Sequence, residues 1–216
     1  MWYSYHIYTQ DRALFLDNLN YLQNYFQYSE FFFIQYLDPI GFHFRLRVRC
    51  SEIECVEREI KSLFINSRVL KKIYDPEYNV FMETLSIYEE FSVKLTKFLV
   101  ENREIAPHHY INDVIKQLLC YFHCNHSQFI YNYSTYWDGY VRFQTEEKKR
   151  ILFEQLRETL EIPAFTNVML SLNSLEEHHL NKELCFKFLH MTLNKCGFSI
   201  PDELNILSEY SRNNLN

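Results

Sequence analysis

The sequence predicts an α+β protein in which an N-terminal ferredoxin-like βαββαβ sheet unit packs with a C-terminal helical half. Two observations lead to this fold class. Strand-like and helix-like patterns alternate over residues 2–75, whereas every pattern from about residue 82 onward is helical. No repeat or linker interrupts the chain, and 216 residues suffice for one large domain. We therefore expect a single unit over residues 1–216, with a sheet half (1–81), a helical half (82–216) and a cleft between them.

The first strand and helix are predicted over residues 2–26. The segment "WYSYHIY" at 2–8 is aromatic and β-branched enough for a strand. Asp11 can cap the helix that follows it. Apolar residues then recur every three or four positions, at Phe15, Leu19, Leu22 and Phe26.

A hairpin and a second strand–helix pair complete the sheet half. "FFFIQYL" at 31–37, the turn "DPIG" and "GFHFRLRVRC" at 41–50 predict two paired strands. Ser51 and Glu54 resemble a capping box at the start of the helix "SEIECVEREIKSLF". "VLKKIYD" at 69–75 predicts the fourth strand, which gives the order βαββαβ.

The helical half shows apolar faces at helical spacing. One face consists of Ile87, Phe91, Leu95 and Phe98, and another of Ile111, Ile115, Leu118 and Phe122. Two further helical patterns lie around 146–160 and 176–195. The last is expected to stop at Gly197, with Pro201 beyond it.

Charge and composition narrow the class of protein. With 28 acidic and 22 basic residues the net charge is −6, which argues against a general nucleic-acid binder. The N-terminus lacks a signal-peptide pattern, and no segment approaches ~18 uninterrupted apolar residues, so no membrane partner is expected. Six scattered cysteines favour reduced thiols and a cytoplasmic protein.

The segment at 41–50 carries the clearest candidate site. His43, Arg45, Arg47 and Arg49 alternate with apolar residues, so a strand sends all four polar side chains to one face. An exposed charged face or a protected edge strand would also explain the pattern. Two later segments favour a site: "IYDPEY" holds Asp75 and Glu77 after the fourth strand, and "HMTLNKCG" at 190–197 places His190 and Asn194 on one helix face. An isolated helix histidine would otherwise be interpreted as buried and hydrogen-bonded.

Other clusters are better explained by packing or solvation. "CYFHCNH" at 120–126 has zinc-ligand residue types but no second ligand pair, so no metal site is expected. The pairs at 108–109 and 178–179 are interpreted as solvated histidines. The aromatic run Tyr131, Tyr133, Tyr136 and Trp137 is interpreted as half-buried packing, with a stacking platform for a ligand as the alternative.

Taken together, three segments resemble a known family. "FFFIQYLDPIGFHFRLRVR", "YDPEY" and "HMTLNKCG" look like motifs of the C-terminal elimination domain of class I lanthipeptide dehydratases, which also occurs alone in thiopeptide biosynthesis. The similarity runs from about residue 2 to residue 200, in the same order.

The resemblance implies a cytoplasmic peptide-tailoring enzyme without a cofactor. Its arginine pair maps onto Arg45 and Arg47 and its histidine onto His190, with Glu77 or Tyr74 assisting catalysis. Guanidinium groups bind carboxylates bidentately and stabilise charge on a carbonyl oxygen, and histidine moves protons near neutral pH. His43, Arg49 and Asn194 are the expected substrate-binding residues. The implied partners are a precursor peptide with its leader and the dehydratase and azole-forming enzymes that modify the same precursor.

Departures from the family pattern separate three functions. Eliminating members expel glutamate from glutamylated Ser or Thr, and usually carry an arginine three residues after the glutamate, followed by "YGG". Here Val80 stands at that position, the glycines are absent, and Gln35 replaces a common arginine. These losses favour the pyridine synthase branch, which joins two dehydroalanines in a formal [4+2] aza-cycloaddition. The glutamate-eliminating lyase is the alternative, and a non-catalytic leader-binding protein is the third hypothesis.

Overall fold

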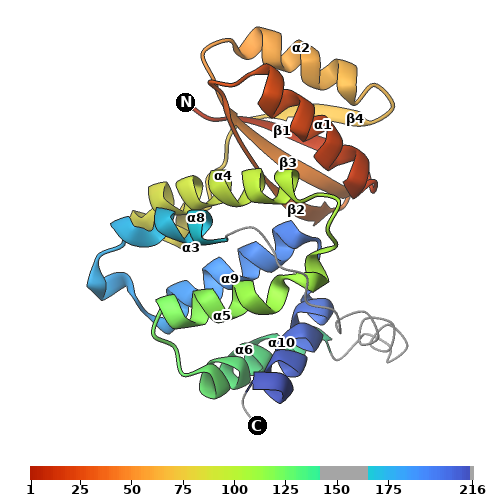
Figure 1. Ribbon diagram of the computed structural model, residues 1–216. Coiled ribbons are helices and arrows are strands. Elements are labelled where there is room, and N and C mark those ends of the chain that lie inside the picture. Colours follow the sequence, from red (N-terminus) through yellow and green to blue (C-terminus); the bar gives the residue numbers. More distant parts are fainter. Residues whose placement is uncertain (142–164, 215–216) are drawn as a thin grey trace. The chain divides into compact units, whose positions relative to one another are not determined.

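The computed structural model describes residues 1–141 and 165–214 (Figure 1). The chain divides into two compact units, Met1–Glu104 and Ile105–Asn216, and each is described by itself. The predicted helix around 146–160 lies outside the described residues.

The first unit contains a four-stranded sheet. Its elements follow one another as β1 (Tyr3–Tyr8), α1 (Arg12–Tyr25), β2 (Glu30–Asp38), β3 (Gly41–Arg49), α2 (Ile53–Leu63) and β4 (Arg68–Lys72). The spatial order of the strands is β2-β3-β1-β4, and all neighbouring strands are antiparallel. Each helix thus connects two strands that flank a third, which is the split βαβ arrangement. The predicted α+β class with a ferredoxin-like βαββαβ unit is confirmed.

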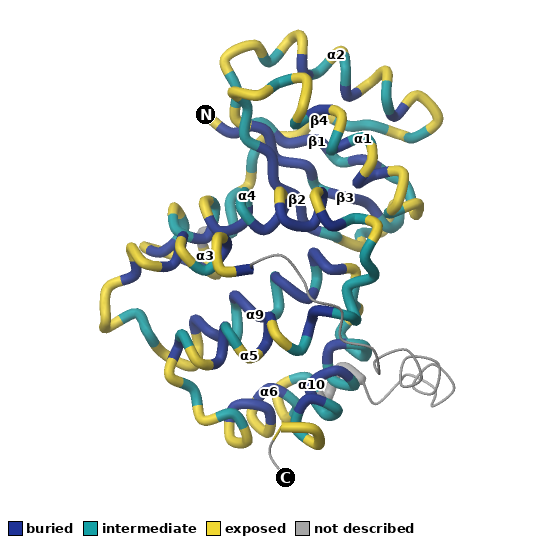
Figure 2. The backbone as a smooth tube through the Cα atoms, viewed as in Figure 1, coloured by how far each residue is buried: buried dark blue, intermediate teal, exposed yellow. Residues whose placement is uncertain are grey.

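The register of the strands separates an apolar from a polar face. Tyr5 lies opposite Leu46, and the next residue along β1, His6, lies opposite Arg45. On the apolar face, the Phe15 ring of α1 stacks on Phe44 with centroids 3.9 Å apart. Burial of these aromatic side chains anchors α1 to the sheet, and Figure 2 shows the central strands as largely buried.

Helix α4 packs on the other face, at β2. It spans Leu85–Glu101 and follows the short helix α3 (Tyr78–Phe81) and a 3₁₀ turn over Met82–Thr84. The rings of Phe32 in β2 and Tyr88 in α4 meet edge to face, 6.3 Å apart, and Trp2 meets Phe32 in the same way at 4.9 Å. In Figure 1, α1 and α2 lie above the sheet and α4 below it. The polar face is therefore covered at β2.

Two local predictions in the first unit were confirmed, namely the helix cap at Asp11 and the turn between the two hairpin strands. The Asp11 side chain accepts a hydrogen bond from the Leu14 amide and caps α1. In the turn after β2, Asp38 accepts from the amides of Ile40 and Gly41, and Gly41 has a φ of 141°. Such a positive φ favours glycine, because it has no side chain to clash.

Two local predictions in the first unit were wrong. The N-cap of α2 is Glu52, which makes no side-chain capping bond, so Ser51 and Glu54 do not form a capping box. Because the helix begins at Ile53, Ser51 lies one residue too early to cap it. The fourth strand is also shorter than predicted: it ends at Lys72, and Ile73 is 93% exposed beyond it.

The second unit is helical in its described part. It contains α5 (Ile111–Tyr121), α6 (His126–Val141), α8 (Thr166–Met169), α9 (Lys182–Cys196) and α10 (Ile200–Asn214). Short 3₁₀ turns cover Pro107–His109, Leu170–Ser174 and Glu177–His179. Ile111, Ile115 and Leu118 are buried as the spacing predicted. Helix α9 stops at Gly197, which has a φ of 99°, also as predicted.

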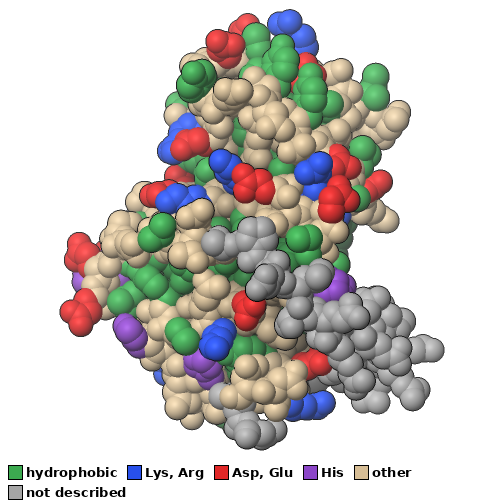
Figure 3. All heavy atoms as spheres, in the orientation of Figure 1, with side chains coloured by type: hydrophobic (Ala, Val, Ile, Leu, Met, Phe, Trp, Pro, Cys, Tyr) green, Lys and Arg blue, Asp and Glu red, His purple; other side chains and the backbone are tan. Residues whose placement is uncertain are grey.

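Two surface features bear on function. Acidic and basic side chains are interspersed over the face shown in Figure 3. Within the described ranges, no helix combines the length and the apolar character needed to cross a membrane.

Candidate functional site

Arg47 is the most deeply buried cation of the β3 face. Strand parity points its side chain to the polar face, where it is only 1% exposed. The guanidinium donates to the Ser4 hydroxyl of β1 and, over 3.3 Å, to the Asp75 carbonyl oxygen. Its Nη2 also lies 3.6 Å from a carboxylate oxygen of Glu77. Arg47 therefore joins β3, β1 and the segment after β4.

The electrostatics of this group follow from burial. Desolvation lowers the pKa of Arg47, and the nearby Glu77 carboxylate opposes that shift. Arginine stays charged in proteins, so the carboxylate is its required counter-ion. The Nε of Arg47 and the second oxygen of Glu77 are buried, and neither has a hydrogen-bond partner among the described residues.

Tyr74 flanks the Arg47–Glu77 pair. The Arg47 guanidinium lies 5.2 Å from the centre of the Tyr74 ring, a cation–π distance. The Tyr74 hydroxyl donates over 2.5 Å to Glu89 of α4, which also accepts from the Trp2 indole. Burial, and then Glu89, raise the pKa of the Tyr74 phenol well above its usual value. Tyr74 is thus a neutral hydrogen-bond donor fixed between the sheet and α4.

Arg45 shares the face of Arg47 but has different surroundings. It is half-buried, and its guanidinium carbon lies 3.4 Å above the centre of the Tyr36 ring. Its Nε donates over 3.4 Å to Nε2 of His43. The two terminal nitrogens of Arg45 make no hydrogen bond or ion pair with a described residue, so this guanidinium can still bind a substrate oxygen.

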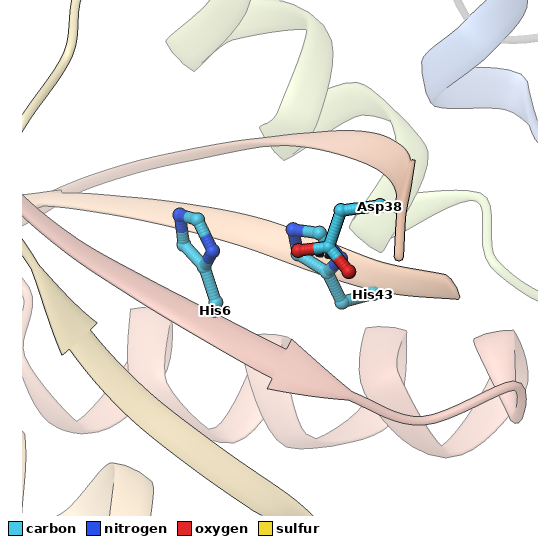
Figure 4. Close-up of side chains that lie close together, drawn as sticks. All are labelled: His6, Asp38 and His43. Atoms are coloured by element: carbon cyan, nitrogen blue, oxygen red, sulfur yellow. Dashed lines mark ion pairs between the residues drawn. The ribbon is translucent and has the colours of Figure 1, made fainter. Parts of the chain in front are cut away.

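His43, which accepts from Arg45, forms a group with His6 and Asp38, and Figure 4 shows these three side chains close together. One ligand atom from each of these three residues lies within 4.8 Å of the others, which is a spacing that could hold a metal ion. The buried His43 is already paired, because its Nδ1 lies 3.1 Å from the Gly41 carbonyl oxygen and its Nε2 accepts from Arg45. Asp38 likewise accepts from two turn amides and Tyr8. A cation would have to displace these partners next to Arg45, so the group fits a hydrogen-bonded support better than a metal centre.

Arg49 lies at the exposed end of the same face. It pairs with Glu30 of β2, and its guanidinium lies 4.7 Å from the Trp2 ring. Hydrogen bonding to Glu30 raises the pKa of Arg49. Arg49 therefore links the strand ends, and in this state its charge is already compensated.

His190 of α9 is held by a buried carboxylate. Its Nδ1 lies 3.0 Å from Oε2 of Glu203 in α10, and Glu203 is 1% exposed. The Trp137 ring lies 5.1 Å from the imidazole. The His190 side chain is 27% exposed, and its Nε2 has no described partner. With Nδ1 donating to Glu203, Nε2 is the nitrogen left to accept or deliver a proton.

The carboxylate of Glu203 is shared with Tyr133 of α6. The Tyr133 hydroxyl donates to Oε2 of Glu203 over 2.5 Å, and Tyr133 is fully buried. Burial raises the pKa of Glu203, and the hydrogen bonds from His190 and Tyr133 oppose the shift. Helices α6, α9 and α10 thereby converge on one carboxylate behind His190.

The remaining predicted positions have mixed surroundings. Asn194 lies half-buried on α9, four residues after His190. In "CYFHCNH", Sγ of Cys120 lies 3.9 Å from Nε2 of His126, whereas Cys124 contacts Cys185 of α9. In the aromatic run, Tyr133 is buried and Trp137 half-buried, whereas Tyr131 and Tyr136 are 68% and 69% exposed. The Tyr136 ring still meets the Phe186 ring edge to face, with centroids 4.9 Å apart.

The sequence predicted one catalytic site made of Arg45, Arg47, Tyr74, Glu77 and His190. Within the first unit the structure brings Arg47, Tyr74 and Glu77 together and places Arg45 on the same face, whereas His190 belongs to the second unit. Sequence reasoning did not find Glu203, Tyr133 or Glu89, which supply the supporting carboxylates and a buried phenol. The helix that carries Glu203 was not predicted, so nothing linked this residue to His190. Ser4 could have been found, because strand parity places it on the face that meets Arg47.

The fold and these residues define an α+β protein with an arginine–carboxylate pair on a ferredoxin-like sheet and a carboxylate-backed histidine on a helix. The family model "Lantibiotic biosynthesis dehydratase C-term" matches residues 2–212, so the chain belongs to that family. No match was found among curated proteins.

A solved structure shares the fold. The chain is similar to the tRNA-dependent lantibiotic dehydratase MibB from Microbispora sp. 107891, with 17% sequence identity and a TM-score of 0.61. The match covers 100% of this chain and 28% of MibB, so the chain spans under a third of that protein's length. At this identity the likeness shows the fold alone.

Proposed function

We propose that this chain is a tailoring enzyme for ribosomally made peptides, and that it is a pyridine synthase of thiopeptide type. It would join two dehydroalanines of a linear, azole-bearing precursor in a formal [4+2] aza-cycloaddition. Loss of water and of the leader peptide then gives the central pyridine of a macrocycle. Membership of the dehydratase family supports peptide tailoring in general.

One position carries the choice of reaction. Val80, where eliminating relatives usually have an arginine, lies on the short helix α3 and is 40% exposed. An apolar side chain there supplies no donor for the carboxylate of a leaving glutamate. The nearby Arg47 is already engaged by Ser4, Asp75 and Glu77. These two facts favour a substrate that has no free glutamate to hold.

In the proposed reaction, the residues of the two units have different roles. Arg45 offers its terminal nitrogens to an amide carbonyl and stabilises negative charge that develops on that oxygen. Arg47, Glu77 and Tyr74 hold the strand and the following segment in place around it. His190, oriented by Glu203, transfers the proton at Nε2. Holding the two ends of a long peptide together can supply about 7–11 kcal/mol of the rate enhancement.

The test is a mass measurement on two substrates. A precursor that already carries two dehydroalanines and azoles is expected to lose water and its leader, released as a peptide amide. A glutamylated precursor is expected to stay unchanged. Rapid release of glutamate by the unmodified protein would instead establish the eliminating lyase.

The eliminating lyase is the second candidate, because Arg45, Arg47 and His190 match the family's motif residues. The non-catalytic leader-binding role is the third. It predicts saturable binding of the leader without any product from either substrate. The same two incubations, with a leader titration added, therefore separate all three functions.

A further inference from the structure

The sheet carries six cationic side chains, and they differ in whether a carboxylate pairs with them. Arg47, Arg49 and Lys71 pair with Glu77, Glu30 and Glu57, respectively. Arg45, Arg68 and Lys72 form no ion pair with any described residue. Three uncompensated cations on one small sheet are unexpected in a chain whose net charge is −6.

The three unpaired cations lie on the same face of β3 and β4, the two strands that flank β1. His6 of β1 lies opposite Arg45 of β3 and opposite Leu70 of β4. Along β4, Arg68 precedes Leu70 by two residues and Lys72 follows it by two, so both share its face. Strand spacing puts Arg68 and Lys72 about 13 Å apart, and β3 lies about 10 Å from β4. We call the face formed by Arg45, Arg68 and Lys72 around His6 the cationic face.

His6, at the centre of this face, is affected by burial and by the cations around it. The pKa of His6 is lowered from its usual value to about 4, first by burial and then by His43, Arg45, Arg47 and Lys72. The imidazole therefore stays neutral at physiological pH, and it does not add to the repulsion between the cations. Tyr8, which the Arg68 guanidinium approaches to 5.7 Å, offers an aromatic surface beside it.

Protection of a sheet edge explains only part of the pattern. Strand β4 lies at the end of the strand order, and charged side chains on an edge strand discourage pairing with other chains. Arg68 and Lys72 fit that role. Arg45 does not, because β3 is an interior strand two positions away from β4.

We propose that the cationic face binds an acidic, extended segment of the peptide substrate. The inference rests on the proposed function for the existence of a peptide substrate, and it adds the chemistry by which that peptide is recognised. Alternate side chains of an extended segment point the same way about 7 Å apart, so two or three carboxylates can reach Arg45, Arg68 and Lys72. Attraction across an uncompensated face also speeds encounter with an acidic partner.

Binding of a model peptide tests the proposal without requiring turnover. The probe is a fluorescein-labelled peptide in which glutamate alternates with serine, and its reference replaces every glutamate with glutamine. Fluorescence anisotropy with the full chain at low salt should show saturable binding of the glutamate probe and at least about tenfold weaker binding of the reference. Equal binding of the two probes would overturn the proposal.

A charge-matched pair of variants locates the surface. Arg68→Gln with Lys72→Gln should weaken binding of the glutamate probe about fivefold, as expected for two partly exposed charge contacts. Arg58→Gln with Lys116→Gln removes the same charge from exposed residues elsewhere and should leave the affinity unchanged. An equal loss in both pairs would show a general charge effect and contradict the assignment. Competition by a single-stranded oligonucleotide as strong as by the peptide would also contradict it.

The outcome is separable from that of the proposed reaction. If the glutamate probe binds but the cyclisation assay gives no product, the cationic face is kept as a binding surface and the pyridine synthase function is rejected. If the Arg68–Lys72 variant cyclises its precursor and binds it with the affinity of the parent, only the proposal for the cationic face is rejected.

Discussion

Each unit pairs a basic side chain with a carboxylate, but the two pairs are buried in opposite ways. Arg47 is almost fully buried, and its guanidinium contacts one partner from β1 and two from the segment after β4. His190 is partly exposed, and only one ring nitrogen is held, while the buried member of its pair is Glu203. The first arrangement fixes a cation in place, whereas the second leaves one nitrogen available for chemistry.

This difference separates positioning from reaction. A buried cation whose two terminal nitrogens are both engaged within the protein holds the elements around it in place, and it has little capacity left for a substrate. A half-exposed base with a carboxylate behind it keeps its orientation and still reaches a substrate. We therefore assign Arg47 to support and His190, together with Arg45, to contact with the substrate.

The largest expected effect is on stability, in the first unit. Arg47→Met leaves the Glu77 carboxylate buried without its counter-ion, and we expect the free energy of unfolding to fall by about 3–5 kcal/mol. Urea unfolding followed by circular dichroism measures the loss. Adding Glu77→Gln should restore part of it, because no uncompensated charge remains. A double variant as unstable as the single one would show that the pair is not the cause.

The next effect is on rate, in the second unit. His190→Phe should lower the single-turnover rate by at least about 10²-fold, because the group that transfers the proton is lost. The affinity for the leader should change little. The unfolding midpoint should fall modestly, because the buried Glu203 keeps the hydrogen bond from Tyr133 but loses the one to His190. If His190→Phe were to turn over normally but melt earlier, the histidine would be structural and the assignment would fail.

A comparable loss of the single-turnover rate is expected when Arg45 is replaced. Arg45→Lys keeps the charge but removes the planar fork and its stacking on Tyr36, so the rate should fall by about 10²-fold. Arg58→Lys is the matched control, because Arg58 is exposed on α2 and belongs to no candidate site. The control should retain the parent rate. Equal rates for Arg45→Lys and the parent would remove Arg45 from the site.

The smallest effect is a pH dependence of stability at Glu203. Burial raises the pKa of this carboxyl above its value in the unfolded chain, which is about 4.3. The folded state therefore binds the proton more tightly, and its stability falls as the pH rises through the raised pKa. Glu203→Gln cannot ionise and should lack this decline.

The comparison is sharpest in a variant that lacks the His190 imidazole. Urea unfolding of His190→Phe, with and without Glu203→Gln, should be compared between pH 4.5 and 7. The stability of the glutamate form relative to the glutamine form should decrease with pH. A difference that grows with pH would mean that the buried carboxylate is stabilised in its charged form.

Several features of both units could be predicted from local sequence. The alternation at 41–49 depends only on strand parity, the Asp11 cap on its spacing to the Leu14 amide, and the stop at Gly197 on a backbone angle that glycine adopts readily. The capping box failed because the helix began later than its motif suggested. Packing of the surrounding elements settles helix ends of this kind.

The sequence by itself determined the order of the elements, the polar and apolar faces of β3, and the residues that can supply a fork, a carboxylate and a proton-transfer group. Only the tertiary structure decided how deeply each of these groups is buried and whether a group of opposite charge lies beside it. Arg45 and Arg47 are equivalent by strand parity. Arg47 is nevertheless enclosed by Ser4, Asp75 and Glu77, whereas Arg45 lies on the Tyr36 ring with its terminal nitrogens open. The physical reason is that desolvation and counter-charges come from residues distant in the chain, such as Glu203 behind His190, and no periodicity encodes which of them will meet.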